Sequence, residues 1–317
     1  MNARTWTRRL FVSATLVVGV IYCLLYILSF TYPLPVFSHV SLDAKLKFLS
    51  QTDRTMTADT IIMGSSVGVD NINGVLLEEL SPVAHEVLNY SAWGLNPVQI
   101  EQLLPVVLDN SNIRRIIYAV TPGDFTRSDP LGGYDERLVR KYIYNRLSVF
   151  DHLFLLNKAA NNHRAYWKTI QNWKTRLQNE HIVTSLLFDR TGGVALNIHD
   201  VDHKSSDKPA DYRQLDDAAF QALERIMQVV AGRNIRLYLV VTPQRRESLD
   251  EDADQAANFS LFIERARKIV QSNQGYFLDL HARMELEDKY FVDNLHLNDE
   301  GASAVAEMLA GIVEAEP

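Results

Sequence analysis

Three separated fragments of the chain contain the residue types of a serine-dependent acyl-transfer site. Gly64-Ser65-Ser66 follows one apolar run, Asn89 to Gly94 follows another, and Asp293-Asn294-Leu295-His296 lies near the C-terminus. A serine hydroxyl becomes a nucleophile when a histidine takes its proton, and a carboxylate orients that histidine. The fragments therefore supply a candidate nucleophile, Ser66, a base, His296, and an orienting acid, Asp293.

Each fragment alone is weak evidence. Gly64 permits a sharp turn before Ser66, but serines are common at turns and helix starts. The spacing of Asp293 and His296 lets the carboxylate hold one imidazole nitrogen while the other faces a serine. A histidine in a polar surface loop has the same local sequence. The order and context of the fragments give them their weight.

Five short apolar, β-branched runs alternate with helical patterns, which indicates βαβ units and a parallel sheet covered on both faces. The expected strands are 60–63, 86–89, 115–120, 236–241 and 276–280, and the expected helices are 75–80, 97–108, 216–231, 254–271 and 299–313. We predict an α/β fold of three αβα layers, with strand order 2-1-3-4-5. The carboxyl edge of such a sheet is where open α/β folds place their chemistry, and there we expect Ser66, Gly94, Gly123 and His296.

Residues 125–215 interrupt this alternation between the third and fourth strands. A connection this long usually has structure or function of its own. Segments 137–160 and 164–177 are helix-like, whereas 189–209 is polar and irregular. We predict a helical cap beside the site, and the aromatics of 142–173 are expected to form its core in preference to a sugar-stacking platform.

The N-terminal segment has the composition of a membrane anchor. Leu10 to Tyr32 is a run of 23 residues without Asp, Glu, Lys or Arg, and roughly 20 suffice to cross a bilayer. Arg4, Arg8 and Arg9 precede it, which favours an N-terminus inside and the remaining chain outside. A cleaved signal peptide is the alternative, but the run is long and no Ala-x-Ala site follows. We therefore expect an anchor at 1–39, a linker and helix at 40–58, and the catalytic-type domain at 59–317.

Charge and cysteine content restrict the partners and the compartment. The only cysteine, Cys23, lies in the anchor, so the outer domain has no disulfide, which suits a bacterial periplasm. Residues 40–317 contain 29 basic and 39 acidic side chains, a net charge of −10. This balance argues against nucleic-acid binding. We expect a single-pass protein of the bacterial inner membrane whose domain is periplasmic.

Taken together, the motifs resemble the SGNH (GDSL-type) hydrolase superfamily from about residue 59 to 313, apart from the insertion. That superfamily has a nucleophilic serine in Gly-Asp-Ser, an oxyanion-hole glycine in Asn-x-x-x-x-Gly, an oxyanion-hole asparagine in Gly-x-Asn-Asp, and a terminal Asp-x-x-His. The resemblance implies Ser66 as nucleophile, Gly94 as oxyanion glycine, Asp293 as acid and His296 as base. It implies no cofactor.

Two positions depart from the family pattern. Ser65 stands where the family has the aspartate before the nucleophile, and Gly123 stands where it has the oxyanion asparagine, although Asp124 matches the next residue. Loss of one oxyanion donor typically costs about 10²–10³ in rate. The oxyanion hole could consist of the backbone N–H groups of Ser66 and Gly94, or a donor from the insertion could complete it. Alternatively, the site could be weak or inactive.

The resemblance implies a membrane-anchored esterase or O-acyltransferase acting on acyl esters, expected to be acetyl esters, of a cell-surface or secreted polysaccharide. Its relatives often work beside a multi-spanning membrane acyltransferase. One alternative is a weak or inactive subunit that binds glycan or scaffolds a membrane complex, and another is a membrane-surface lipase or lysophospholipase. Candidate substrate contacts are Asn89, Asp124, Gln244 and Arg245. The cluster His199-Asp200-Val201-Asp202-His203 is expected to be solvated and not to bind metal.

Overall fold

A five-stranded parallel sheet forms the centre of the computed structural model, which describes residues 3–172, 178–179, 182–183, 186–201, 212, 214–247 and 253–315. Its strands are β1 (Thr60–Gly64), β2 (Val87–Asn89), β3 (Arg115–Val120), β6 (Arg236–Val241) and β7 (Tyr276–Asp279). The order is β2-β1-β3-β6-β7 and every neighbouring pair is parallel. The predicted α/β class and strand order are confirmed.

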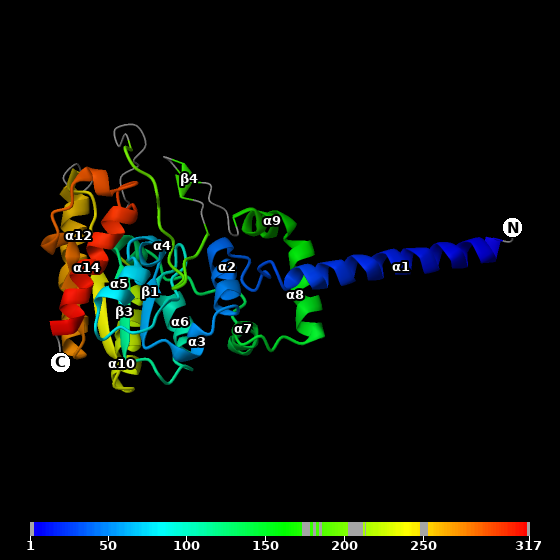
Figure 1. Cartoon of the computed structure of the whole chain (residues 1–317), viewed down its shortest axis with the longest axis horizontal. Coiled ribbons are helices and arrows are strands. Elements are labelled where there is room, and N and C mark those ends of the chain that lie inside the picture. Colours follow the sequence, from blue (N-terminus) through cyan, green and yellow to red (C-terminus); the bar gives the residue numbers. More distant parts are fainter. Residues whose placement is uncertain are drawn as a thin grey trace.

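Helices cover both faces of this sheet (Figure 1). One layer contains α6 (Pro97–Val107), α10 (Asp217–Ala231) and α12 (Ala253–Ser272), and the other contains α5 (Gly74–Leu80) and α14 (Asp299–Ala315). Alternate strand residues serve the two layers: Ile61 packs into the first core and Ile62 into the second. Because successive side chains on a strand point to opposite faces, a strand buried on both faces must be apolar throughout.

The segment that follows the N-terminal helix is part of the domain. After α1 (Ala3–Ser29) come α2 (Val40–Leu49) and α3 (Arg54–Thr57). Leu42, Leu46 and Leu49 of α2 are buried in the same core as Ile61. Residues 40–58, predicted as a linker and helix, therefore share the hydrophobic core of the sheet domain.

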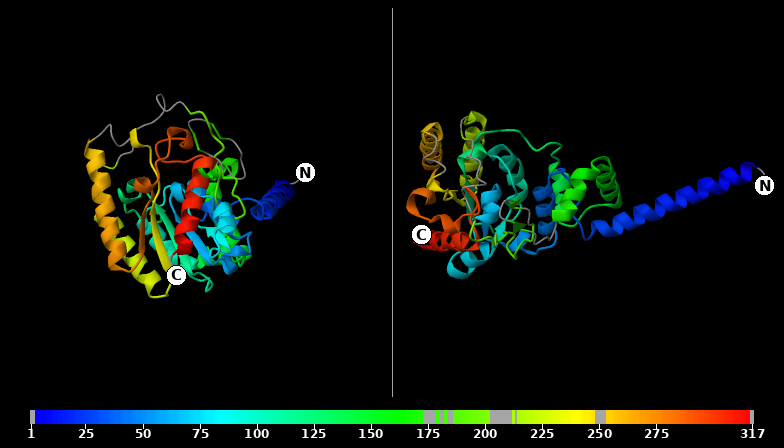
Figure 2. Two further views of the ribbon diagram at one scale, coloured as in Figure 1. Left: turned by 60° about the vertical axis from the view of Figure 1, so that its left-hand side comes forward. Right: turned by 90° about the horizontal axis from the view of Figure 1, so that it is seen from above.

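The insertion between β3 and β6 divides into parts with different neighbours. It contains η1 (Pro122–Phe125), α7 (Glu136–Ile143), α8 (Val149–Asn161), α9 (His163–Asn172) and the antiparallel pair β4 (Gln178–Asn179) and β5 (Ile182–Val183). Helices α7 and α9 pack on α2, and α8 packs on α1. These helices therefore lie on the side of the domain from which α1 projects (Figures 1 and 2), which corrects the prediction that the whole insertion is a cap beside the site.

The helix predicted at 137–160 is in fact two helices. Asn145 has a left-handed φ of 53°, which ends α7, and Ser148 begins α8 with a capping box in which its Oγ accepts from the Asp151 N–H at 3.2 Å. A serine with an acidic residue three positions later is a helix-start signal. The sequence therefore contained the break, within an apolar pattern that continued across it.

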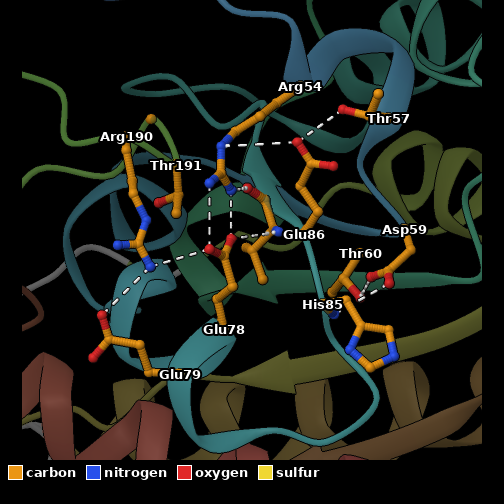
Figure 3. A network of polar contacts seen from close by, with 12 residues as sticks. Arg54, Thr57, Asp59, Thr60, Glu78, Glu79, His85, Glu86, Arg190 and Thr191 are labelled. Atoms are coloured by element: carbon orange, nitrogen blue, oxygen red, sulfur yellow. Dashed lines mark hydrogen bonds and ion pairs between the residues drawn. The ribbon is translucent and has the colours of Figure 1, made fainter.

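A polar network at the start of β2 joins α3, α5 and the 186–201 segment (Figure 3). Glu78 of α5 accepts from Arg54 of α3 and from Arg190, the latter at 3.0 Å. Its carboxylate also accepts the backbone N–H of Val87 at 3.0 Å. The same 186–201 segment contacts α4 (Ser66–Asp70), since the Val194 N–H donates to the Val69 oxygen at 3.0 Å.

Helix α1 projects away from the domain (Figures 1 and 2). Its segment Arg4–Ile27 is the one described helix that is long and apolar enough to cross a membrane, and its side chains are exposed. The Nζ of Lys47, on α2, donates to the Phe30 oxygen at 2.6 Å. A cation at a helix C-terminus satisfies free carbonyls and the helix dipole, so this contact joins the end of α1 to the domain. The remaining short elements are α13 (Leu280–Arg283) and η2 (Asp288–Tyr290).

Replacing Leu46 with alanine tests whether α2 belongs to the folded core. Leu46→Ala should lower the free energy of unfolding by about 2–5 kcal/mol, because it empties a buried site. Met56→Ala, at a side chain that is half-exposed on α3, should change it by about 0.5 kcal/mol or less. Denaturant titration of the detergent-solubilised chain measures both. An unchanged Leu46→Ala curve would mean that α2 is a tether outside the cooperative fold.

Candidate active site

Ser66 lies at the exit of β1, where the chain turns into α4. Gly64 makes the turn possible: its φ is +154°, and a Cβ there would collide with the backbone oxygen of Ala119 on β3. The strand thus delivers a half-buried serine hydroxyl to the carboxyl edge of the sheet.

His296 reaches this hydroxyl from the other end of the sequence. Its Nε2 lies 2.7 Å from Ser66 Oγ, and its Nδ1 lies 2.7 Å from Asp293 Oδ2. The other Asp293 oxygen accepts the backbone N–H groups of Leu295 at 2.9 Å and His296 at 2.7 Å. With Nδ1 donating to the carboxylate, Nε2 is the lone-pair nitrogen and can accept the serine proton.

Neighbouring side chains hold the loop that carries Asp293 and His296. Asn71, just after α4, donates to the Leu295 oxygen at 2.6 Å and accepts the Leu297 N–H at 2.9 Å. Arg245 is buried; its backbone N–H donates to the Asn294 oxygen at 3.1 Å. The loop is therefore fixed both to the serine helix and to the chain that follows β6.

The acid and base shift each other's pKa. Burial opposes ionisation of Asp293, but the imidazolium charge and its hydrogen bonds outweigh burial and lower the pKa of the carboxyl below its ordinary value of 3.8. Burial likewise opposes protonation of His296, yet Asp293, with further contributions from Asp70 and Asp124, raises the pKa of the imidazole above 6.5. The pair therefore favours the charge distribution that forms when the base takes a proton.

Asp70 is a site residue that sequence reasoning missed. It is buried, and neither carboxylate oxygen has a hydrogen-bond partner among the described residues. Burial raises its pKa to about 7, an effect that the charge of His296 partly offsets. The available signal was its position: Asp70 comes one helical turn after Ser66, in an otherwise apolar stretch.

The Asn89–Gly94 loop follows β2 and is bound to the turn that carries Ser66, since the Ala92 N–H donates to the Gly64 oxygen at 3.3 Å. Gly94 has a left-handed φ of 64°, which glycine adopts at little cost. No hydrogen bond within the described chain occupies the backbone N–H of Gly94 or of Ser66. Both groups are available to an oxyanion.

Asn89 organises this loop and is not placed to contact substrate. It is buried, its Nδ2 donates to the Gly68 oxygen at 2.6 Å, and its Oδ1 accepts the Ser91 N–H at 2.8 Å. Helix α2 makes two hydrogen bonds to the loop. Lys45 Nζ donates to the Asn89 oxygen at 3.1 Å, and Ser41 Oγ accepts the Trp93 N–H at 3.0 Å. Helix α2, which follows α1 in the chain, therefore holds the glycine loop directly.

Gly123 lies in η1, after β3, and carries no side-chain donor. The space beside it is taken by the ring of Tyr212, which a Cβ at Gly123 would meet at 3.4 Å. The Tyr212 hydroxyl donates to Gln244 Oε1 at 2.6 Å. Asp124 accepts the Thr121 N–H at 2.8 Å and a hydrogen bond from Ser65; burial raises its pKa to about 6. Ser65 thus pairs with Asp124, which is an internal residue and not a substrate contact.

Gln244 and Arg245 are also internal, contrary to the prediction that they could meet substrate. Both are buried. Gln244 is engaged by Tyr212, although its Nε2 has no partner among the described residues. Arg245 pairs with Asp288 at 3.1 Å and with Asn294 Oδ1 at 3.3 Å. Arg245 thus holds the loop that carries His296, whereas Gln244 bonds to Tyr212 beside Gly123.

The remaining sequence candidates lie elsewhere. His199 Nε2 lies 3.1 Å from Asp299 Oδ1, whereas Asp202 and His203 fall outside the described residues, as does Trp173. No group of three potential metal ligands occurs within the described ranges. Of the insertion aromatics, Tyr142 is buried and its hydroxyl accepts the Leu34 N–H at 3.0 Å, while Trp167 is exposed.

Solved structures of similar chain path include three named for ester chemistry. A lipase/acylhydrolase from Enterococcus faecalis is 10% identical, with 81% of this chain and 95% of that chain covered and a TM-score of 0.42. A GDSL-like lipase from Bacteroides thetaiotaomicron is 10% identical (84% and 91%, TM-score 0.39). A catalytic mutant of an acetylxylan esterase from Geobacillus stearothermophilus is 9% identical (82% and 94%, TM-score 0.41). No protein-family model matches the chain, and no curated protein matches it.

The raised pKa of His296 predicts an alkaline shift in activity. Only neutral imidazole accepts the Ser66 proton, so ester hydrolysis should increase as the pH rises, with its midpoint above 6.5. Asp70→Asn removes a negative charge that favours the imidazolium, and should move that midpoint to lower pH. Glu307→Gln, at an exposed residue of α14, is the matched control. An unchanged midpoint in Asp70→Asn would contradict the effect of the Asp70 charge on the pKa of His296.

Ser41→Ala tests the support that α2 provides to the glycine loop. Loss of the acceptor for the Trp93 N–H should loosen the neighbouring Gly94 and lower kcat by roughly tenfold, equivalent to about one hydrogen bond. Ser50→Ala is the control, because Ser50 is buried at the end of the same helix and its hydroxyl donates to the nearby Lys47 oxygen, away from the glycine loop. Steady-state kinetics on an activated ester separates kcat from KM; equal loss in both variants would indicate general destabilisation.

Proposed function

We propose that this chain is a serine-dependent carboxylic-ester hydrolase or O-acyltransferase. The observation that supports the proposal is the unbroken line of contacts from Asp293 through His296 to Ser66, both of 2.7 Å. Two of these residues are separated by 230 positions in sequence, and the loops that bring them together are fixed by Asn71 and Arg245. Hydroxyl, imidazole and carboxylate in this order are the parts that nucleophilic acyl transfer requires.

The chemistry follows from the contacts. Ser66 Oγ attacks the ester carbonyl carbon while His296 Nε2 takes its proton, and Asp293 stabilises the imidazolium that results. The backbone N–H groups of Ser66 and Gly94 stabilise the negative oxygen of the tetrahedral intermediate. Collapse breaks the ester C–O bond, and the imidazolium protonates the departing alcohol. Water or an acceptor hydroxyl then gives its proton to His296 as its oxygen attacks the acyl carbon, and the imidazolium returns a proton to Ser66 Oγ as the acyl–serine bond breaks.

The proposal extends to location and substrate class. The exposed apolar helix Arg4–Ile27 would anchor the chain in the inner membrane with its domain on the periplasmic side. The substrate would be acyl esters, in particular acetyl esters, of a cell-surface or secreted polysaccharide. A multi-spanning acyltransferase is the proposed membrane partner. The support for these finer assignments is the anchor together with the motif resemblance.

One structural observation favours an alternative, a catalytically weak or inactive subunit. Gly123 offers no side-chain donor, and the adjacent Tyr212 and Gln244 bond to each other. The oxyanion would then depend on two backbone N–H groups. This arrangement predicts slow hydrolysis of simple esters if the site is active, since charge stabilisation is reduced while nucleophile and base are intact.

Covalent labelling distinguishes the two. A fluorophosphonate probe should label the full-length chain in detergent at Ser66, as peptide mass spectrometry would show. Labelling and esterase activity should vanish in Ser66→Ala and His296→Ala. Asp293→Ala should retain roughly 10²-fold more kcat than His296→Ala, because the carboxylate orients and stabilises but does not exchange protons with the substrate.

Ser65→Ala is the matched control, since Ser65 is the adjacent serine and bonds to Asp124 instead of His296. It should keep the label. If the wild-type chain takes no label and turns over neither ester nor acylated glycan, while Ser66→Ala still supports surface modification in cells, then the chain acts as a non-catalytic subunit.

A further inference from the structure

Helix α8 carries two exposed phenylalanines on the side that faces away from the domain. Its inner side buries His152, Leu155, Leu156 and Ala159. At about 100° per residue, Phe150, Phe154, Asn157 and Asn161 fall on the opposite side, which carries no charge. Phe150 is 82% exposed and Phe154 60% exposed. A helix on the surface of a water-soluble protein normally presents polar residues there.

The position of α8 relative to α1 suggests what covers this face. The segment of α1 that can cross a membrane ends at Ile27. Around this end, the ring of His152 on α8 lies 5.0 Å from the ring of Tyr26 and 5.3 Å from that of Phe30, and its Nδ1 lies 2.9 Å from Ser29 Oγ. Figure 1 shows α8 running across the end of α1. An α1 that spans a bilayer therefore holds α8 at the bilayer's edge.

Helix α9 adds the residue types of a membrane interface on the same side of the domain (Figures 1 and 2). Trp167 is 62% exposed, and Arg164 and Lys168 beside it are exposed as well. Trp residues concentrate at the level of lipid headgroups, and Lys and Arg attract anionic headgroups. The exposed Trp, Arg and Lys of α9 are therefore the residue types expected at the bilayer surface, where α1 would also hold α8.

We infer that α8 and the Trp167 side of α9 lie on the membrane as a second contact beside α1, with Phe150 and Phe154 in the boundary between headgroups and acyl chains. The inference rests on the proposed anchoring by α1. The occupant is lipid, because α1 brings this face to the bilayer whether or not another protein is present. Two contacts fix the tilt of the domain, and α2, packed on α7 and α9, carries that orientation to the Gly94 loop.

Depth-dependent quenching tests the contact. The full-length chain with Cys23→Ser receives one cysteine at Asn157, which keeps both phenylalanines, and an environment-sensitive nitrobenzoxadiazole label. It is reconstituted without other proteins in vesicles of phosphatidylcholine with a minority of phosphatidylglycerol. The label should shift to the blue and be quenched by lipids brominated near the headgroup. A label at Glu307→Cys, exposed on α14, should show neither effect.

Two further arms complete the experiment. Phe150→Glu with Phe154→Glu should abolish quenching at position 157 while leaving it at a label on native Cys23, within α1. Quenching at Cys23 without quenching at 157 overturns the second contact, leaves the anchor intact and points to a protein as the occupant. Absence of quenching at both positions refutes the anchor itself, and the second contact with it. Neither result bears on labelling of Ser66, which is measured separately in detergent.

Discussion

The contact between the Asp293 carboxylate and the His296 imidazole is the interaction on which the other features of the site depend. Burial disfavours the charged form of both groups, and each group favours the charge of the other across 2.7 Å. Such a pair stabilises a reaction only if its geometry is fixed in advance. This requirement accounts for the hydrogen bonds of Asn71 to the chain on both sides of His296, and for Arg245, whose charge serves the loop instead of the substrate.

The carboxylates around the base give the site a second property. Asp70 and Asp124 are both buried enough for their pKa values to rise, to about 7 and about 6, and both favour a charged His296. Their effect opposes the neutral imidazole that begins the reaction and favours the imidazolium that follows proton transfer.

The route from the N-terminal helix to the glycine loop is short. Three residues of α2 make the connection. Lys47 donates to the end of α1, and Lys45 and Ser41 bond to the Asn89–Gly94 loop. Lys45 is buried, and burial lowers its pKa to about 7. Its amino group contacts the Asn89 oxygen and the ring of Phe188. These contacts offset part of the free-energy cost of burying an amino group. Helix α2 thus contacts both the end of α1 and the glycine loop.

The sequence by itself determined the sheet and the candidate residues at its edge. Short apolar β-branched runs are typical of parallel strands that are buried between two helical layers. Strand bounds such as Arg115–Val120 and Arg236–Val241 could therefore be predicted. Gly64, Ser66, Asp293 and His296 could be proposed because their local spacing already restricts what they do. The tertiary structure alone decided where the insertion packs, that Gln244 and Arg245 turn inward, and that Asp70 faces the base. These outcomes depend on contacts between residues far apart in the chain, and the free energy of burying a polar group depends on neighbours that local sequence does not identify.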